Sequence, residues 1–428
     1  MIIHTIRPGE SVWSISQQYG VNPNRIVQIN QLPDPSRLLI GQSILIPRDR
    51  PPTHTVQPGE SLWILAQRFG TTVEAIAQAN QIMEPAMIFP GMVLTIPPRP
   101  RPTIETNGYI QRLGDVGLAT VQQVGNYLTY LSLFSYEVRS DGTLAPLDDE
   151  AIIAEARARG AAPLMVITNI VEGEDFSSDL ARAVLANPEV QETLITNILS
   201  TMGAKGFTGL NIDFEYIYPA DRELYNQFLQ RVVDRLRPQG FSISSAVAPK
   251  VSADQVGLLY EAHDYPVHGQ LLDFVVIMTY EWGWSGGPPM AVAPVNQVRR
   301  VLDYAVTAIP REKIMMGMPL YGYDWTLPFV RGETWAATLS PQGALQRAIQ
   351  YNTIIEYDPI AQAPFYSYYD QQGREHIVWF EDARSAQAKY DLLREYNLRG
   401  VSYWVLGLDF PQNWPLLVDN FEVRKIIE

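Results

Sequence analysis

The chain has 428 residues, of which 46% are hydrophobic, and its net charge is −14. This length and apolar content allow a large buried core and more than one domain. The absence of cysteine excludes disulfides, thiolate metal sites and a cysteine nucleophile, and the acidic balance argues against nucleic acid or an anionic membrane as a partner.

The negative charge lies beyond the first hundred residues. Residues 1–102 hold eight Lys/Arg and six Asp/Glu, a net charge of +2, so the remaining chain carries −16. The sequence opens Met-Ile-Ile-His-Thr, with no basic leader before a long apolar run, and no stretch of about 18 apolar residues follows. We therefore expect neither a recognisable signal peptide nor a membrane span, and infer a removed leader or another export route.

The first hundred residues contain a direct repeat with a period of 50, in which 17 of 44 aligned positions are identical between 4–47 and 54–97. Such a period is typical of small repeated units. Each copy predicts the order strand, helix, helix, strand. In the first copy these are a strand over 2–6, a helix capped by Ser11, a short helix over 26–30 and a strand over 43–47.

This unit resembles the LysM module, whose members bind glycans that contain N-acetylglucosamine, such as peptidoglycan and chitin. The resemblance rests on the Pro-Gly-Glu-Ser-aliphatic-Trp block, the central Asn and the terminal Gly-x-x-Ile/Leu-x-Ile-Pro. It implies two modules, over 2–47 and 53–97, each with a sugar groove between two loops. The groove residues implied are Gly9, Glu10, Ser11, Val12, Asn30, Gln31 and Leu32, and Gly59, Glu60, Ser61, Leu62, Asn80, Gln81 and Ile82.

Two further expectations concern these modules. Trp13 and Trp63 are expected to be core residues rather than sugar platforms. The Pro-rich segments at 47–53 and 98–104 are expected to be semi-rigid spacers, and two weak sites on one chain should raise avidity.

From about residue 105 onward, β-rich runs alternate with amphipathic helical patterns, which is typical of parallel strands with crossover helices. Eight such units predict an α/β fold, a (β/α)8 barrel over 105–428, with its active site at the carboxyl ends of the strands. An apolar stripe over 224–236 marks the helix after the fourth strand. A hairpin of 365–369 and 376–380 is expected in an insertion near 326–380. The predicted barrel strands are 108–110, 128–136, 163–169, 209–215, 242–248, 274–280, 314–321 and 400–405.

The fourth predicted strand reads Gly-Leu-Asn-Ile-Asp-Phe-Glu. Because side chains alternate along a strand, Asn211, Asp213 and Glu215 project to one face. Two carboxylates and an amide make a poor core, so Glu215, at the strand's end, is a candidate acid catalyst.

This segment resembles the strand-4 motif Asp-Gly-x-Asp-x-Asp-x-Glu of family 18 glycoside hydrolases, the chitinases and their relatives. Three further segments resemble motifs of that family in the same order: Met-Thr-Tyr-Glu at 278–281, Gly-Met-Pro-Leu-Tyr-Gly at 317–322 and Gly-Val-Ser-Tyr-Trp at 400–404. The resemblance implies a retaining glycosidase that uses the substrate's own acetamido group as nucleophile, with no cofactor and no metal.

The resemblance also implies residue roles. Glu215 would be the general acid and later the base, and Asp213 would accept the substrate's acetamido N–H. Tyr280 would hold the acetamido oxygen in line for attack. The residues implied to bind substrate are Trp404, Tyr321, Glu281, Met278 and Tyr109.

Two positions depart from the family's strand-4 pattern, because Thr208 and Asn211 stand where the family usually has its first and middle Asp, and in the second motif Glu281 stands in place of Asp. A middle Asp would raise the pKa of its neighbour by like-charge repulsion. Our hypothesis is that Asp213 stays ionised and that Asn211, a catalytic-site residue in this scheme, hydrogen-bonds and orients it.

Rival interpretations remain. Gly-Trp-Ser-Gly-Gly at 283–287 fits the Gly-x-Ser-x-Gly elbow of serine hydrolases, but that elbow needs a helix directly after the serine, and two prolines follow here. A flexible loop at the rim of the active site is favoured. A glycan-binding lectin on an inactive barrel is the rival outside the enzymes, and the presence of Glu215 favours the enzyme.

The substrate is inferred from a finer resemblance. The N-terminal LysM repeats, Asn-Ile-Asp-Phe-Glu, Met-Thr-Tyr-Glu-Trp-Gly and the missing leader together resemble the spore-cortex-lytic subgroup of endospore-forming bacteria. This implies an N-acetylglucosaminidase, acting as a monomer on cortex peptidoglycan at the spore cortex, coat or cell wall. A chitinase is the main enzymatic alternative.

Overall fold

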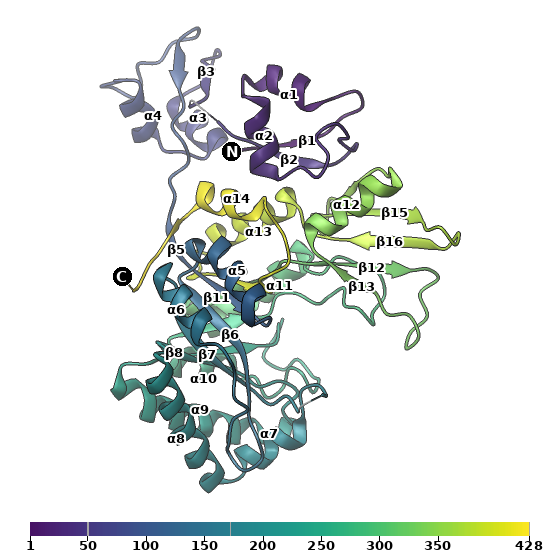
Figure 1. Cartoon of the computed structure of the whole chain (residues 1–428). Helices are drawn as coiled ribbons and strands as arrows, with labels where there is room; N and C mark the ends of the chain where they lie inside the picture. The colour runs from purple at the N-terminus through teal and green to yellow at the C-terminus, as the bar shows by residue number, and fades with distance from the viewer. Residues whose placement is uncertain (49–50, 172, 428) are drawn as a thin grey trace.

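The computed structural model describes residues 1–48, 51–171 and 173–427 (Figure 1). Two small modules precede a barrel, which carries an inserted sheet on one side. Residues 49–50, within the predicted spacer 47–53, and residue 428, at the end of the predicted barrel, lie outside the described part.

The barrel has eight parallel strands and closes because the last strand pairs with the first, Val401 lying opposite Thr106. All eight predicted strands are present, which confirms the (β/α)8 fold. The first begins at Thr103, inside the predicted linker. The strands in chain order are β5 (Thr103–Ile110), β6 (Tyr130–Glu137), β7 (Ala162–Thr168), β8 (Gly209–Asp213), β9 (Ser242–Val247), β10 (Phe274–Ile277), β11 (Ile314–Pro319) and β17 (Gly400–Trp404).

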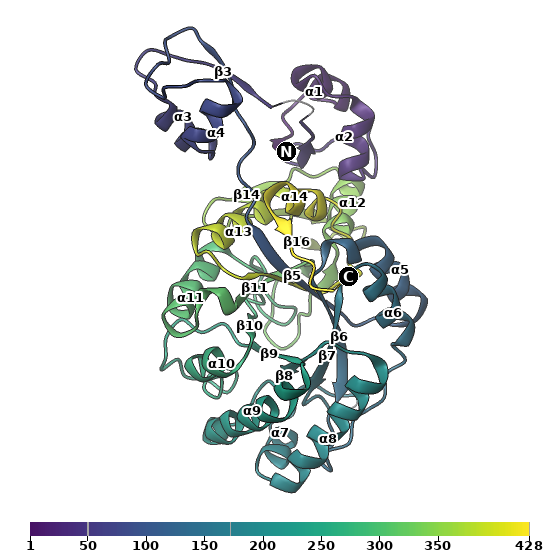
Figure 2. The same cartoon turned by 90° about the vertical axis from the view of Figure 1, so that its left-hand side faces the viewer.

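Helices follow the strands and cover the outside of the barrel (Figure 2). None of the helices that the structure describes combines the length and apolar character needed to cross a membrane. A short strand, β18 (Glu422–Val423), adds to β5 near the chain's end. The helices are α5 (Gly114–Val124), α6 (Glu150–Ala158), α7 (Ser178–Leu185), α8 (Pro188–Lys205), α9 (Arg222–Leu236), α10 (Tyr265–Leu271), α11 (Val295–Ala308), α13 (Ala383–Glu395) and α14 (Asn413–Asn420).

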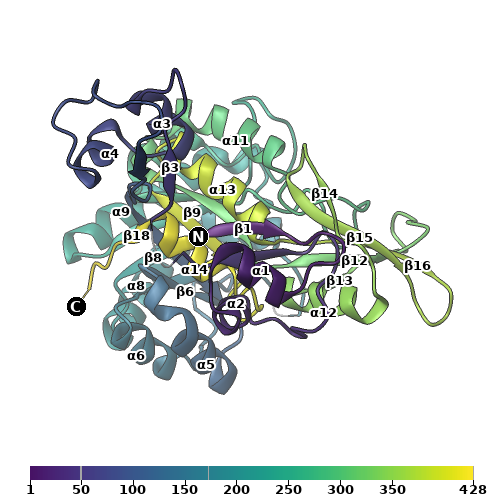
Figure 3. The same ribbon diagram turned by 90° about the horizontal axis from the view of Figure 1, so that it is seen from above.

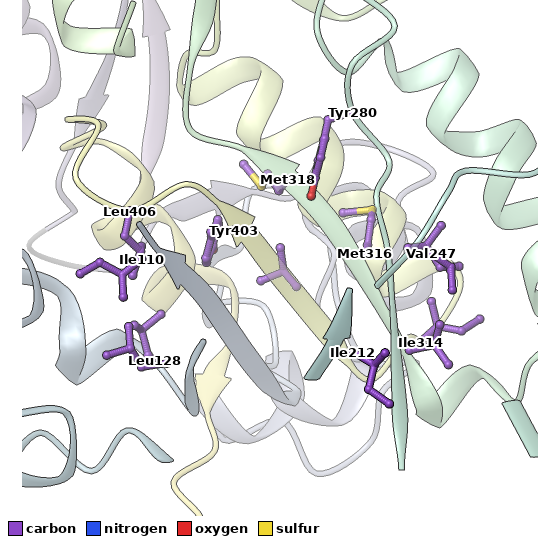
Figure 4. Packing of buried hydrophobic residues seen from close by; sticks show 14 of the residues in the cluster. Ile110, Leu128, Ile212, Val247, Tyr280, Ile314, Met316, Met318, Tyr403 and Leu406 are labelled. Atoms are coloured by element: carbon purple, nitrogen blue, oxygen red, sulfur yellow. The ribbon is translucent and has the colours of Figure 1, made fainter. Parts of the chain in front are cut away.

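Strand alternation divides the barrel core into two layers. Leu210 and Ile212 of β8 pack outward into the large core between strands and helices, part of which Figure 4 shows around Ile212, Val247 and Ile314. Asn211 and Asp213, on the other face of β8, are buried inside the barrel. The predicted apolar stripe of α9 is confirmed, since it buries Phe228, Leu229, Val232, Val233 and Leu236.

The insertion lies between β11 and α13 and forms its own five-stranded sheet with one helix. The predicted hairpin is confirmed, because β15 and β16 pair antiparallel, with Ser367 opposite Ile377. The elements are β12 (Gly322–Thr326), β13 (Ala337–Leu339), α12 (Pro341–Tyr351), β14 (Glu356–Asp358), β15 (Ala363–Tyr369) and β16 (Glu375–Trp379).

Both repeats fold in the predicted order, each as two helices against a two-stranded antiparallel sheet. Ser11 and Ser61 cap the first helix of their repeats, and a left-handed glycine, Gly20 or Gly70, ends it. The first module consists of β1 (Ile2–Thr5), α1 (Val12–Tyr19), α2 (Pro23–Asn30) and β2 (Ser43–Ile46); the second consists of β3 (Thr53–Thr55), α3 (Leu62–Phe69), α4 (Val73–Ala79) and β4 (Val93–Thr95).

The first module is docked on the barrel and the insertion, and Figure 3 shows it from above. Gln412 donates hydrogen bonds to Asn30 Oδ1 and to the carbonyl of Ser43, both at 2.9 Å. The Ile355 amide donates to the carbonyl of Ile40 at 2.9 Å. Apolar contacts complete the interface, because Leu39 packs into the core of the insertion and Leu45 into the barrel core.

The second module stands away from the barrel (Figure 1). The residue corresponding to Leu39 is Phe89, which is exposed here, and the residue corresponding to Ser43 is the exposed Val93. Two copies of one sequence pattern therefore have different surroundings: the surface that docks the first module on the barrel is exposed at the corresponding positions of the second.

A matched pair of glycines tests this docking. Gly41 and Gly91 occupy the same repeat position with φ of +83° and +93°, but a Cβ at Gly41 would lie 1.8 Å from the Ile355 carbonyl oxygen, while one at Gly91 meets nothing within 4 Å. Both alanine variants should lose about 1 kcal/mol to left-handed backbone strain. Only Gly41→Ala should also expose the Ile355 amide to hydrogen exchange; equal exchange in the two variants would contradict the docking.

Candidate active site

A cleft of about 560 Å³ opens at the carboxyl ends of the barrel strands. Its walls come from segments far apart in sequence, as expected for the mouth of this barrel. It brings together seven of the nine predicted catalytic and substrate-binding residues: Asp213, Glu215, Tyr280, Glu281, Met278, Tyr109 and Trp404.

Glu215 lies just outside the strand that was predicted to carry it. Strand β8 ends at Asp213, two residues earlier, so the prediction of a strand through 215 is wrong. The chain turns away at once, since Tyr216 has a φ of +53°, which is uncommon for a residue other than glycine. The carboxyl nevertheless enters the cleft.

The main chain at Glu215 is held by one amide side chain. Asn169, directly after β7, accepts a hydrogen bond from the Glu215 N–H at 2.9 Å and donates one to the Glu215 carbonyl at 2.8 Å. These two bonds replace the ladder bonds that a longer β8 would have made. Asn169 is thus placed to set the position from which the Glu215 carboxyl projects.

A buried histidine holds the preceding residue. His263 Nδ1 accepts from the Ala248 N–H, so Nε2 carries the proton and donates to the Phe214 carbonyl, both at 2.9 Å. Burial lowers the pKa of His263 to about 4, which keeps the ring neutral and preserves this pattern at neutral pH. His263 thereby ties the end of β8 to the segment after β9.

Enclosure in the cleft changes the acidity of the two central carboxyls. Burial raises the pKa of Asp213 to about 7, because a carboxylate loses hydration there. The pKa of Glu215 is raised well above its ordinary value, first by burial and then by the negative charges of Asp213, Glu281 and Asp175. A Glu215 that keeps its proton near neutral pH is suited to general-acid catalysis.

The hypothesis about Asn211 is wrong in its hydrogen bonds. Asn211 Oδ1 accepts from the Tyr109 hydroxyl and its Nδ2 donates to Ser244 Oγ, both at 2.9 Å. Asp213 Oδ1 is buried with no hydrogen-bond partner among the described residues. Asn211 therefore lies beneath the cleft and orients Tyr109, and the raised pKa of Asp213 argues against permanent ionisation.

Glu281 belongs to a small tyrosine cluster at the side of the cleft. It receives hydrogen bonds from the hydroxyls of Tyr321 and Tyr323, the second at 3.0 Å. Burial raises the pKa of Glu281, and these two donors oppose that rise. Tyr321 is buried behind Glu281 and is absent from the cleft lining, so this geometry does not support its predicted contact with sugar.

An aromatic group forms one wall. Trp404 lies edge-to-face with Phe134, at 4.9 Å between ring centroids, and with Tyr109, at 5.5 Å. These two rings hold the indole in place, and Trp404 also lines the cleft. Such a fixed indole offers an apolar face for a sugar ring.

Sequence reasoning missed several residues. Asn169 shares the outward strand face of Met165 and Ile167 by alternation, so the alternation rule gave no signal that it would support the site. His263 had no signal either, because its partners are backbone atoms of distant segments. The cleft residues that were not predicted are Gln111, Phe134, Ile170, Asp175, Phe176, Tyr216, Ala246, Pro249, Leu259, Tyr260, Trp282 and Trp284.

The Gly-x-Ser-x-Gly segment is not a nucleophile elbow. No helix follows Ser285, as that motif requires. The two ends of the loop are joined by main-chain hydrogen bonds, since the Trp282 and Gly283 amides donate to the carbonyls of Val292 and Ala291 at 3.0 Å.

In the LysM modules, many predicted groove side chains serve the module's own fold. The Asn30 amide bonds the carbonyls of Ile26 and Leu45 at 2.8 Å, and Asn80 repeats this with Ile76 and Thr95. Glu10 and Glu60 pair with His4 and His54, and Val12 and Leu62 are buried. Sugar binding by these loops stays a prediction, for which backbone groups and the exposed Gly9, Ser11, Gln31, Gly59, Ser61 and Gln81 remain accessible.

The prediction that Trp13 and Trp63 are core residues is wrong. Their exposed fractions are 68% and 65%. Each is the second residue of a helix whose apolar face is set by other positions, namely Val12 and Ile15 in α1 and Leu62 and Leu65 in α3. Both indoles are therefore surface features of the modules.

Two family models match the sequence. Residues 112–409 match glycosyl hydrolases family 18, and residues 4–47 and 54–97 each match the LysM domain. The first range covers the barrel from α5 to just beyond β17, with the insertion, and the other two cover the small modules.

Similar proteins share this organisation along their whole length. The chain is 52% identical to a cortical fragment-lytic enzyme of Bacillus subtilis over 99% of both chains. It is 36% identical, over the full length of both, to a putative sporulation-specific glycosylase of the same species. Among solved structures, the spore cortex-lytic enzyme SleL of Bacillus megaterium matches with a TM-score of 0.87 and 44% identity over 99% of both chains.

Removing the Asn169 amide should impair catalysis more than binding. We expect Asn169→Ala to lower kcat tenfold to a hundredfold with KM within about twofold, because losing two hydrogen bonds of about 1 kcal/mol each frees the Glu215 main chain. Ser178→Ala is the control, since the Ser178 hydroxyl donates its hydrogen bond to the carbonyl of Tyr216, the residue after Glu215. A variant that loses thermal stability but keeps its kcat would refute this positioning role.

The raised pKa of Asp213 also predicts a pH-dependent stability. A carboxyl with a folded-state pKa of about 7 favours folding below its unfolded pKa near 4, and this contribution is lost as pH rises through 7. Asp213→Asn should therefore be more stable than the parent at pH 8, by up to about 4 kcal/mol, with the difference vanishing near pH 4. Denaturant unfolding at the two pH values measures it, with the exposed Asp148→Asn as control; a constant difference would contradict the shift.

Proposed function

Since the chain belongs to family 18 of the glycosyl hydrolases, we propose that this glycoside hydrolase cuts the glycan strands of spore cortex peptidoglycan as an N-acetylglucosaminidase. The full-length similarity to cortical fragment-lytic and spore cortex-lytic enzymes supports this substrate. Two LysM domains, a family that binds N-acetylglucosamine glycans, support delivery to the same polymer. The proposed site of action is the spore cortex.

The proposed reaction divides the chemistry between enzyme and substrate. Glu215 protonates the departing glycosidic oxygen while the substrate's acetamido oxygen attacks the anomeric carbon, giving an oxazolinium ion. Glu215 then takes a proton from the incoming water, which opens that ion with retention of configuration. Asp213 accepts the acetamido N–H, Tyr280 holds the acetamido oxygen, and Trp404 supports the sugar ring.

The observation that carries this proposal is the pair of adjacent carboxyls in one enclosed cleft. Burial and mutual repulsion raise the pKa of Glu215, the largest cause being burial. The lining holds Tyr280 and Trp404 with this pair, which supplies a proton donor, an acetamido partner and a ring platform together. A glycan-binding lectin would have no need for a half-buried acid of raised pKa.

Replacing Glu215 with a residue that cannot donate a proton to the leaving oxygen tests the activity. Glu215→Gln should lower turnover of purified cortex peptidoglycan at least a thousandfold, because the leaving oxygen then departs unprotonated. Glu261→Gln is the matched control, since this glutamate also follows a barrel strand but does not line the cleft. Undiminished release of fragments by Glu215→Gln would refute the assignment.

The products identify the substrate. Mass spectrometry of digests of cortex, vegetative wall and chitin should show cortex degraded first, with N-acetylglucosamine at the new reducing ends. Preferential degradation of chitin would instead identify a chitinase. Muramic sugars at the new reducing ends would contradict the proposed bond.

A further inference from the structure

Two exposed tryptophans meet at the edge of the cleft. Trp284, on the loop after β10, and Trp335, on the loop between β12 and β13, lie 6.0 Å apart between ring centroids with their planes at 79°. Their exposed fractions are 44% and 64%. The proposed mechanism uses neither residue, although Trp284 lines the same cleft as Glu215.

The two loops that carry these rings are tied together. The Ala336 amide donates to the Ser285 carbonyl at 2.8 Å. Trp325, which is fully buried, donates from its indole nitrogen to the Gly287 carbonyl at 2.8 Å. This corner, which consists of Trp284, Trp335 and the loops that carry them, therefore joins the barrel to the insertion through two hydrogen bonds.

Two glycines give the rings their places. A Cβ on Gly286 would lie 2.5 Å from the Trp284 ring and 2.9 Å from the Trp335 ring, and one on Gly287 would lie 2.4 Å from Trp284 Nε1. Trp284 thus lies back against its own loop, where only glycine leaves room. The exposed indoles are held in position rather than extended freely into water.

We propose that Trp284 and Trp335 form a distal sugar-binding subsite, which takes the apolar C–H face of a pyranose ring beyond the residue whose bond is cut. The inference rests on the proposed function, because it assigns the glycan as occupant. Three features favour a sugar: Trp284 lines the catalytic cleft, Trp335 adds a second exposed indole in contact with it, and the two loops that carry these rings are tied together before binding. Exposing two indoles to water is unfavourable unless a ligand covers them.

A distal subsite acts only on substrates long enough to reach it. We expect Trp335→Ala to lower kcat/KM on an N-acetylglucosamine hexamer about tenfold more than on an aryl N-acetylglucosaminide, which is the loss of one aromatic stacking contact. Trp335→Phe should restore most of the difference. Tyr369→Ala removes an equally exposed aromatic (64%) of the insertion. Among the described residues its ring, unlike that of Trp335, contacts no aromatic residue of the cleft lining, so this variant should change activity on neither substrate.

Binding without turnover separates this inference from the proposed function. In full-length Glu215→Gln, the hexamer should shift the indole N–H NMR signals of Trp284 and Trp335, which report this corner separately from the LysM modules, and Trp335→Ala should weaken the Kd read from Trp284 about tenfold. Hexamer that shifts these signals but is never cut by the parent protein would support the subsite and contradict the hydrolase. Equal losses on long and short substrates, or unshifted indole signals, would overturn the subsite.

Discussion

The partial withdrawal of two neighbouring carboxyls from water, Asp213 fully buried and Glu215 half-buried, is the constraint on which the active site depends. Asp213 lies inside the barrel and Glu215 at its mouth, and burial is the largest cause of the raised pKa of each. The fold accepts this unfavourable burial because the outward face of the same strand packs Leu210 and Ile212 into the main core. Strand alternation therefore supplies stability on one side and chemical reactivity on the other.

Holding such an acid requires contacts that do not touch its carboxyl. A hydrogen bond to the ionised form would lower the pKa and weaken the acid. The chain instead holds the main chain around Glu215, through both amide atoms of Asn169 and through His263 on the preceding carbonyl. The position of the acid is thus fixed while its proton affinity is left to the enclosing walls.

The barrel, its eight strands and seven cleft residues could be predicted from the sequence, because alternation and ordered motifs are local signals. Sequence reasoning placed Glu215 on the strand, since the turn at Tyr216 depends on distant Asn169 and has no local signature. It paired Asn211 with Asp213 because neighbours on one strand face look adjacent, whereas Tyr109 and Ser244 from other strands compete for the amide. It also treated the repeats as equivalent, although Leu39 and Phe89 occupy the same repeat position, one buried and one exposed.

The central claim is that Glu215 retains its proton near neutral pH within the enclosed cleft. Carbon-13 NMR of the protein labelled at glutamate side-chain carboxyls, compared with Glu215→Gln, measures this directly. The expected result is one glutamate signal that titrates well above the usual range for glutamate and disappears in the variant. If the signal lost in Glu215→Gln titrates near pH 4.5, the enclosure does not tune the acid and the account is contradicted.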